Sequence, residues 1–363
     1  MKQLEKQGSN RRSFLKSWML AAGVATASAG ILGSGVSAFG EGREEGGITK
    51  GDIAILQLLL AAEIIETDLW QQYRELGGVE ATGGPSQAYI TALEQLDGDM
   101  PQYISDNTDD EISHVAFLTA YLKSKGQRPI NLDKFRNLQG STAEGAKKIG
   151  RLTNLKQLSV DTSWWTRYRS TENPDLGAKF PQAVPSLSVG QHPAIPTSQA
   201  DFNDPNHIQA IANTAGFHFA FIEQAGTSLY ASLSQRVSSR EVLRITISIG
   251  GAEIMHFQVW HDKAGNAVAL TDGSLTFQNL ALNQPESLQA NLIMPEPCDF
   301  IDGLPECSII RPTGAGQLDA VGAINGFIAD GLFIGQPKEF TQLLLHLAQE
   351  ADEARPELSE KLR

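Results

Sequence analysis

Glu111-Ile112-Ser113-His114 and Glu253-Ile254-Met255-His256 are two copies of one Glu-Ile-x-His pattern in this 363-residue chain. A matching segment precedes each copy, because Glu63-Ile64-Ile65-Glu66-Thr67-Asp68-Leu69-Trp70 and Glu223-Gln224-Ala225-Gly226-Thr227-Ser228-Leu229-Tyr230 both read Glu-x-x-x-Thr-x-Leu-aromatic. The chain therefore has the order Glu, Glu-x-x-His, Glu, Glu-x-x-His. This order predicts two related halves, each with a lone glutamate on one helix and a Glu-x-x-His pattern on the next.

The spacing within these segments indicates metal ligands. Residues three positions apart lie on the same face of a helix, so the Glu and His of one pattern can reach the same ion. A glutamate from another helix would complete each half-site, and a carboxylate could bridge two ions. Four carboxylates and two imidazoles roughly match the charge of two divalent ions and suit iron or manganese better than a metal that prefers thiolates. The predicted ligands are Glu63, Glu111, His114, Glu223, Glu253 and His256.

The two lone glutamates also lie within apolar runs. Glu63 follows Leu58-Leu59-Leu60-Ala61-Ala62, and Glu223 follows Phe219-Ala220-Phe221-Ile222. A carboxylate buried on such a face needs a partner, because leaving it unpaired is very costly. The alternative is that these glutamates form ordinary salt bridges or lie at helix edges. Four matching sites in the same order favour the metal site.

Other polar residues near the patterns have simpler interpretations. Glu66 lies one turn from Glu63 and could replace it as a ligand, but its counterpart in the repeat is Gly226. Asp110 is expected to face solvent. His218 precedes the second lone glutamate by five residues, which turns it away from the ligand face. It is expected to be packed or exposed.

Helical periodicity predicts a long helix at each of the four segments, at 50–76, 101–125, 207–233 and 238–262, with a shorter helix at 87–96. The predicted helix at 238–262 has the least regular sequence pattern. Arg244-Ile245-Thr246-Ile247-Ser248-Ile249 alternates as a strand does, and Gly250-Gly251 weakens a helix interior. We predict a helix there because a Glu-x-x-His pattern follows.

The predicted fold is all-α, with a bundle at 50–262. Residues 127–206 within it are too long for a turn and form either a crossover or an insertion, in which Trp164-Trp165 is expected to pack over the bundle. Residues 263–363 are expected to form an irregular C-terminal extension that ends in an amphipathic helix at Lys338–Glu353.

The N-terminus reads as an export signal. Ser9-Asn10-Arg11-Arg12-Ser13-Phe14-Leu15-Lys16 resembles the twin-arginine motif, an apolar run follows from Trp18, and Val36-Ser37-Ala38 offers a cleavage site. We therefore expect a signal peptide at 1–38, a linker at 39–49, recognition by the twin-arginine translocation machinery and a periplasmic or secreted location. The alternative is a basic transmembrane anchor. Because this export route carries folded proteins, a metal centre could be assembled before export.

Charge and cysteine content narrow the functional classes further. The formal net charge is −13, which argues against nucleic acid as a partner because phosphate binding needs clustered Lys and Arg. Cys298 and Cys307 are the two cysteines of the chain. In an oxidising compartment they are predicted to form a local disulfide. The alternative is two unrelated thiols, since no zinc motif surrounds them.

Two segments resemble the ferritin-like domain family, namely Asp52-Ile53-Ala54-Ile55-Leu56 followed by Glu63, and Asp110-Glu111-Ile112-Ser113-His114-Val115-Ala116-Phe117-Leu118. That family includes secreted bacterial members and plant desiccation-related proteins, and the resemblance covers about 50–126 and 207–262. It implies an antiparallel four-helix bundle with two iron or two manganese ions held by the six predicted ligands. The chain departs from the family pattern at Trp70, where ferritins often have tyrosine, and at Gly250-Gly251.

The resemblance and the ligand set together predict a redox protein that acts on oxygen or hydrogen peroxide. A di-metal oxidase and a manganese-catalase-like enzyme are both consistent with these ligands. The alternatives are metal binding or storage without turnover, and a stress or desiccation protein whose site is structural. A closed storage shell fits less well with the long crossover and the C-terminal extension, whereas a smaller homo-oligomer is compatible with the sequence.

Overall fold

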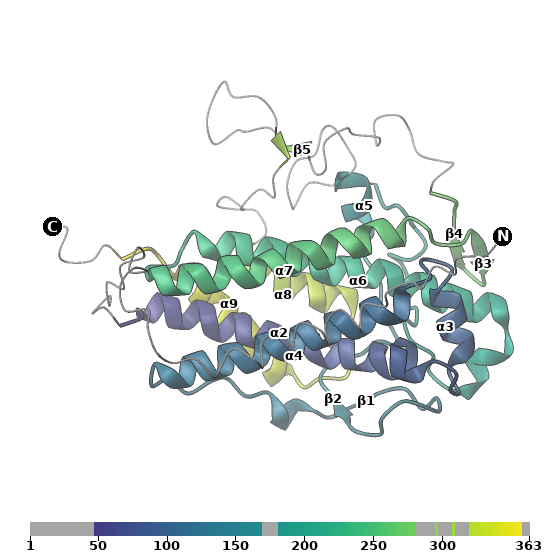
Figure 1. Ribbon diagram of the computed structural model, residues 1–363, viewed down its shortest axis with the longest axis horizontal. Helices are drawn as coiled ribbons and strands as arrows, with labels where there is room; N and C mark the ends of the chain where they lie inside the picture. The colour runs from purple at the N-terminus through teal and green to yellow at the C-terminus, as the bar shows by residue number, and fades with distance from the viewer. Residues whose placement is uncertain (1–46, 169–180, 281–294, 297–306, 309–318, 358–363) are drawn as a thin grey trace, which may run out of the picture. The chain divides into compact units, whose positions relative to one another are not determined.

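Four long helices lie side by side in the computed structural model, which describes residues 47–168, 181–280, 295–296, 307–308 and 319–357 (Figure 1). They are α2 (Lys50–Gly77), α4 (Met100–Ser124), α6 (Pro205–Ser234) and α7 (Arg240–Ala264). α2 packs against α4, and α6 packs against α7. Each pair carries one copy of the sequence repeat, so the predicted all-α bundle is confirmed.

The start of α2 connects the two helix pairs. Thr49 caps this helix, and its side chain and that of Asp52 exchange hydrogen bonds with each other's backbone N–H in a capping box. Oδ1 of Asp52 also accepts a hydrogen bond of 2.8 Å from the backbone N–H of Ser238, in the turn between α6 and α7. One buried carboxylate therefore fixes the end of the first pair against the turn of the second.

α7 is helical through the segment whose sequence alternates like a strand. Ile245 and Ile249 are buried one turn apart, while Ile247 between them is 58 % exposed, so the helical spacing places the apolar face inward. A Cβ added at Gly250 would lie 2.8 Å from the Cβ of Tyr230 on α6. This glycine permits the close approach of α6 and α7, and the predicted helix is confirmed.

The described residues between α4 and α6 form only short elements. Asp68 on α2 holds this segment to the bundle, because its Oδ2 accepts a hydrogen bond from the backbone N–H of Leu152 and its Oδ1 accepts one from Arg136. The short elements of this segment are η2 (Asp133–Phe135), β1 (Leu138–Gln139), β2 (Gly150–Arg151), α5 (Ser163–Tyr168) and η3 (Gln199–Asn203). Another short helix, α3 (Gln87–Leu93), lies between α2 and α4.

Trp164 and Trp165 on α5 lie in the core. The Trp164 ring packs against Phe217 of α6 and Phe257 of α7, and Trp165 stacks on His261 in the last turn of α7. Both tryptophans are buried. The expectation that they pack over the bundle is confirmed.

The C-terminal segment packs on the bundle through two helices, α8 (Ala320–Asp330) and α9 (Lys338–Glu353). α9 has the bounds that the sequence predicts and contacts α2, whereas α8 was not predicted and contacts α6 and α9. Before them come two short antiparallel pairs, β3 (Leu270–Asp272) with β4 (Leu275–Phe277), and β5 (Pro295–Glu296) with β6 (Cys307–Ser308).

The predicted signal peptide and cysteine pair lie wholly or partly outside the described residues. Residues 1–46 and Cys298 belong to the segments that are not described, so export and the disulfide remain predictions. Within the described ranges, no helix is long and apolar enough to cross a membrane.

Candidate metal centre

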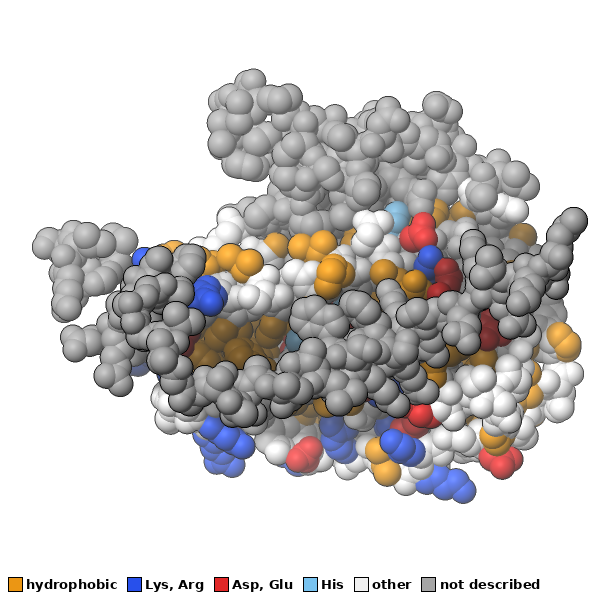
Figure 2. All heavy atoms as spheres, in the orientation of Figure 1, with side chains coloured by type: hydrophobic (Ala, Val, Ile, Leu, Met, Phe, Trp, Pro, Cys, Tyr) orange, Lys and Arg blue, Asp and Glu red, His pale blue; other side chains and the backbone are white. Residues whose placement is uncertain are grey.

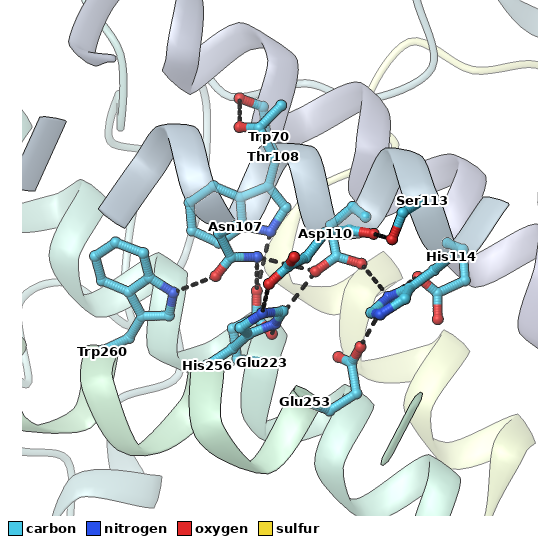
Figure 3. A network of polar contacts seen from close by, with 12 residues as sticks. Trp70, Asn107, Thr108, Asp110, Ser113, His114, Glu223, Glu253, His256 and Trp260 are labelled. Atoms are coloured by element: carbon cyan, nitrogen blue, oxygen red, sulfur yellow. Dashed lines mark hydrogen bonds and ion pairs between the residues drawn. The ribbon is translucent and has the colours of Figure 1, made fainter. Parts of the chain in front are cut away.

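All four long helices contribute to one buried cluster of carboxylates and imidazoles. Its six members fall into two overlapping groups, and in each group the donor atoms lie within 4.8 Å of one another (Figure 3). The four glutamates are fully buried, and the two histidines are 9 % and 8 % exposed. The structure therefore brings together every residue that the sequence predicts as a ligand. The groups are Glu63, Glu111, His114 and Glu253, and Glu111, Glu223, Glu253 and His256.

Glu63 and His114 form what we call the first half-site. Nδ1 of His114 lies 3.2 Å from Oε2 of Glu63. Glu223 and His256 form the second half-site, where Nδ1 of His256 lies 3.2 Å from Oε2 of Glu223. The sequence repeat thus reappears as two equivalent pairs in space.

Glu111 lies between the half-sites and faces both. Its Oε2 is 3.1 Å from Nδ1 of His114, and its Oε1 is 3.3 Å from Nδ1 of His256. A carboxylate with one oxygen toward each imidazole has the position of a ligand that bridges two ions.

Glu253 is the second shared carboxylate, and it is fully buried. Its Oε1 is 3.5 Å from Nδ1 of His114, but neither of its oxygens makes a hydrogen bond with any described residue. Beside it, a Cβ added at Gly226 would lie only 2.4 Å from Oε2. The glycine that replaces Glu66 in the second repeat therefore leaves the space that this carboxylate occupies.

The aromatic residue that ends each repeat segment donates a hydrogen bond to the lone glutamate of the other half-site. Nε1 of Trp70 donates a hydrogen bond of 3.0 Å to Oε1 of Glu223, and the hydroxyl of Tyr230 donates one to Oε1 of Glu63. Each lone glutamate thus has one oxygen held by an aromatic donor and the other directed to a histidine. The departure from tyrosine at Trp70 keeps the donor but replaces a phenol with an indole.

Asn107 and Trp260 are polar partners of the cluster that sequence reasoning missed. Nδ2 of Asn107 donates to Oε1 of Glu111 at 2.9 Å and to Oε1 of Glu223 at 3.0 Å. Its Oδ1 accepts a hydrogen bond of 2.8 Å from Nε1 of Trp260. The available signal was the helical spacing, because Asn107 is one turn before Glu111 and Trp260 is one turn after His256.

Asp110 faces solvent as expected, with its side chain 55 % exposed, but it also contacts the cluster. Its Oδ2 lies 3.0 Å from Nε2 of His256 across the α4–α7 boundary. Nε2 of His114 has no such partner among the described residues. The second half-site therefore has an outer carboxylate that the first half-site lacks.

Glu66 and His218 are buried close to the cluster but belong to neither group. Burial raises the pKa of Glu66 well above its ordinary value, and the negative charges of Glu111 and Glu63 add to this effect. Both positions agree with the expectation from the repeat and the helical spacing, which assigns neither residue to the ligand set.

The protonation of the cluster compensates for its negative charge. Burial and the charge of Glu111 raise the pKa of Glu63 to about 8. Burial also raises the pKa of Glu111, but hydrogen bonds from His114 and His256 outweigh it and lower this pKa to about 2. For His114, hydrogen bonds to Glu111 and Glu63 outweigh burial and raise the pKa to about 10. Protons therefore occupy positions where cations could bind.

The cluster comes closest to solvent at its two imidazoles, between the outer faces of α4 and α7. Apolar side chains are exposed on both faces, including Phe117 on α4 at 52 % and Met255 on α7 at 64 %. Figure 2 shows such apolar side chains over α7.

A family model described as "Ferritin-like domain" matches residues 51–266, which is more than half of the chain. The match contains α4, α6 and α7, all of α2 except its first residue, and all six residues of the cluster. Neither the curated proteins nor the solved structures contain a match to this chain.

Proposed function

We propose that this chain, which belongs to the ferritin-like domain family, binds two redox-active divalent ions and acts on oxygen or hydrogen peroxide. The ions would be two iron or two manganese ions. One ion would be held by the first half-site and the other by the second. The shared carboxylates would bridge them. The proposed ligands are Glu63 and His114, Glu223 and His256, and the bridging Glu111 and Glu253.

The environment of Glu253 is the observation that carries this proposal. The carboxylate is fully buried, its oxygens accept no hydrogen bond from a described residue, and Gly226 leaves space beside it. Its contact with His114 is a 3.5 Å ion pair without a hydrogen bond, and a buried carboxylate without hydrogen bonds is costly. A cation would remove that cost, and the position of Glu253 in both groups suits a bridging ligand.

Charge and donor type support a pair of ions of this kind. Four carboxylates balance two divalent charges, provided that the imidazoles are neutral. Carboxylate and imidazole donors with no thiolate are typical of iron and manganese sites in helical bundles.

When bound, two such ions supply reversible one-electron changes to oxygen or peroxide. The residues of the chain fix the geometry around them. Trp70 and Tyr230 orient the lone glutamates by hydrogen bonds, and Asn107 orients Glu111 and Glu223. Apolar and aromatic side chains pack around the cluster and exclude bulk water, which strengthens the electrostatic interactions within it.

We also propose that the protein is exported by the twin-arginine translocation machinery to a periplasmic or secreted location. This part rests on Ser9-Asn10-Arg11-Arg12-Ser13-Phe14-Leu15-Lys16 and the apolar run that follows. A cluster buried among four helices is most readily loaded when the bundle assembles. Export of the folded protein would allow loading before it leaves the cytoplasm.

Metal analysis combined with peroxide and oxygen consumption tests the proposed function. The purified protein is expected to contain about two ions of iron or manganese per chain and to consume hydrogen peroxide or oxygen. Glu253→Gln, which keeps the size of the side chain but removes its charge, is expected to reduce both. Two bound ions without turnover would favour the non-catalytic metal-binding or stress-protection function. Absence of stoichiometric metal would contradict the proposal.

A further inference from the structure

A second cluster of buried titratable groups lies beside the candidate metal centre. It contains Tyr73 on α2, His218 on α6 and Asp330 at the end of α8, and none of the three is more than 3 % exposed. The hydroxyl of Tyr73 is 2.7 Å from Nδ1 of His218. Nε2 of His218 is 3.5 Å from Oδ2 of Asp330. None of these residues is a proposed ligand, and Asp330 lies outside the range of the family match.

The contacts of His218 indicate which of its nitrogens carries the proton. Burial lowers the pKa of His218 to about 3, so the ring is neutral and has one nitrogen without a proton. With the proton on Nε2, the ring presents an N–H to Asp330 and Nδ1 accepts the hydrogen bond of the Tyr73 phenol. With the proton on Nδ1, the phenolic O–H of Tyr73 would have no acceptor among the described residues. The first arrangement places a free base at hydrogen-bond distance from a buried phenol.

A continuous aromatic contact connects Tyr73 to the candidate metal centre. Trp70 donates its indole N–H to Glu223, and its ring centroid is 5.7 Å from that of Tyr73. Phe219 packs against both, with centroid distances of 4.9 Å to Trp70 and 4.5 Å to Tyr73. An electron that leaves Tyr73 therefore needs only one intervening aromatic residue to reach a proposed ligand.

We propose that Tyr73 is a one-electron donor to the candidate metal centre and that His218 accepts its phenolic proton. This inference rests on the proposed function, in which peroxide is the oxidant of the bound metal pair. One electron passes from the phenol, by way of Trp70, toward the oxidised pair, which is reduced by one electron. The O–H bond of Tyr73 breaks, and the proton bonds to Nδ1 of His218. The products are a neutral tyrosyl radical and an imidazolium that faces Asp330, and return of one electron from an external one-electron reductant reverses both changes.

Two other buried tyrosines provide matched comparisons. Tyr89 on α3 is as fully buried as Tyr73, but its hydroxyl donates to the backbone carbonyl of Ala194 at 2.8 Å, which is not a base of comparable strength. Tyr230 donates to Glu63, a proposed ligand, and is the competing site for a radical. The arrangement of a phenol on a neutral imidazole therefore distinguishes Tyr73 from both.

Electron paramagnetic resonance after rapid mixing with hydrogen peroxide tests the inference on the metal-loaded protein. A radical signal is expected that narrows when the tyrosines are ring-deuterated, is lost in Tyr73→Phe and persists in Tyr89→Phe and Tyr230→Phe. In His218→Gln, which keeps a polar side chain but removes the base, the yield is expected to fall severalfold. Metal content and thermal melting establish that each variant is folded and loaded. Persistence of the signal in Tyr73→Phe with its loss in Tyr230→Phe would overturn the inference.

A metal-free arm separates failure of this inference from failure of the proposed function. Flash oxidation of the metal-free protein by a photogenerated ruthenium(III) complex is expected to give the Tyr73 radical in the wild type and to lose it in Tyr73→Phe. A wild type that binds two ions and consumes peroxide, but gives no tyrosyl signal in either arm, overturns the inference and leaves the proposed function intact. A wild type that binds no stoichiometric metal fails already in the metal analysis, and the role of Tyr73 as a donor to that centre then fails with it.

Discussion

The first and second half-sites have the same ligand types and different surroundings. In both, a lone glutamate accepts a hydrogen bond from an aromatic side chain of the other half, and a histidine directs Nδ1 to the cluster. Among the described residues, only the second half-site has an outer carboxylate on its histidine, Asp110. Oε1 of Glu223 accepts a second hydrogen bond, from Asn107, whereas Oε1 of Glu63 has the Tyr230 hydroxyl as its one partner among the described residues.

This comparison separates what the sequence repeat provides from what tertiary packing adds. The ligands and the aromatic donors belong to the repeat. Asp110 does not, because its counterpart before the second Glu-x-x-His is Ala252. A carboxylate on the outer nitrogen of a ligating histidine fixes the ring and raises its basicity. We therefore expect the second half-site to bind its ion more tightly and to fill first.

Removal of a shared carboxylate should weaken metal binding at both half-sites. Glu111→Gln keeps the volume of the side chain but removes the charge that faces both histidines. We expect the metal content to fall from about two ions to less than about one per chain, because both groups lose a carboxylate. Metal analysis after extensive dialysis measures this.

The control for that variant is Glu66→Gln. Glu66 is also a buried glutamate on one of the four long helices, but it belongs to neither group. Both ions should remain bound. If Glu66→Gln loses as much metal as Glu111→Gln, the ligand set proposed from the repeat is wrong.

Metal binding at the first half-site should also depend on pH. At neutral pH, metal binding at the first half-site must displace protons, because the pKa of His114 is raised to about 10 and that of Glu63 to about 8. We expect the affinity to fall by about tenfold per pH unit for each displaced proton as the pH is lowered from 8 to 6. Isothermal titration in buffers of different ionisation enthalpy counts the released protons. Metal binding without proton release would contradict this prediction.

The metal affinity should rise with pH, whereas the stability of the metal-free protein should fall as the pH rises. His114 has a raised pKa in the folded state, so its contribution is fully present below pH about 6.5 and is lost as the pH rises through about 10. Glu63 is neutral in the fold up to about pH 8 but ionises near its ordinary value when unfolded, so it also favours unfolding as the pH rises in this range. The melting temperature without metal should therefore fall from pH 6 to 9. The increase in melting temperature that metal addition causes should become larger over the same pH range.

The outer carboxylate of His256 should distinguish the half-sites. Asp110→Asn removes the charge beside Nε2 of His256 but retains an amide. Loss of such a partner typically weakens metal binding by about 10- to 100-fold, and we expect this loss for one of the two ions only. Competitive metal titration would resolve the two affinities. Asp106→Asn, an exposed change one turn earlier on α4, should leave both affinities unchanged, and an equal loss at both half-sites would refute the asymmetry.

Sequence reasoning could predict the fold and the six residues of the buried cluster because both depend on helical spacing. The four long helices follow from apolar periodicity, and Glu111 with His114 share a face whatever packs against them. The contact of Asp110 with His256 depends on how α4 and α7 are rotated against each other. That rotation is a tertiary property, so spacing alone suggested only exposure to solvent for Asp110.

The helix α8 was missed for a different physical reason. Its eleven residues are rich in Ala and Gly, with an apolar content that indicates no single face. The helix is defined by its ends, where Asp319 caps the start and Gly331 adopts a positive φ of 89° at the close. Packing against α6 and α9 then stabilises it, and through Asp330 it reaches the interior beside His218.

The adjacent glycines of α7 provide the smallest and most selective test, because they lie in the ligand helix of the second half-site where α4 has Thr108 and Asp109. An added Cβ at Gly251 meets nothing within 4 Å, so Gly251→Ala should stabilise the metal-free protein by about 0.5–1 kcal/mol through the unfolded chain and the helix propensity.

Gly250→Ala has the same propensity gain, but its Cβ would lie 2.8 Å from the Cβ of Tyr230. That overlap should outweigh the gain and destabilise the protein by about 1–3 kcal/mol. It should also disturb the hydrogen bond from Tyr230 to Glu63, so a change in the second half's helix should weaken the first half-site. Urea unfolding measures both variants, and equal stabilisation by the two would mean that close packing of α6 on α7 is not the reason for Gly250.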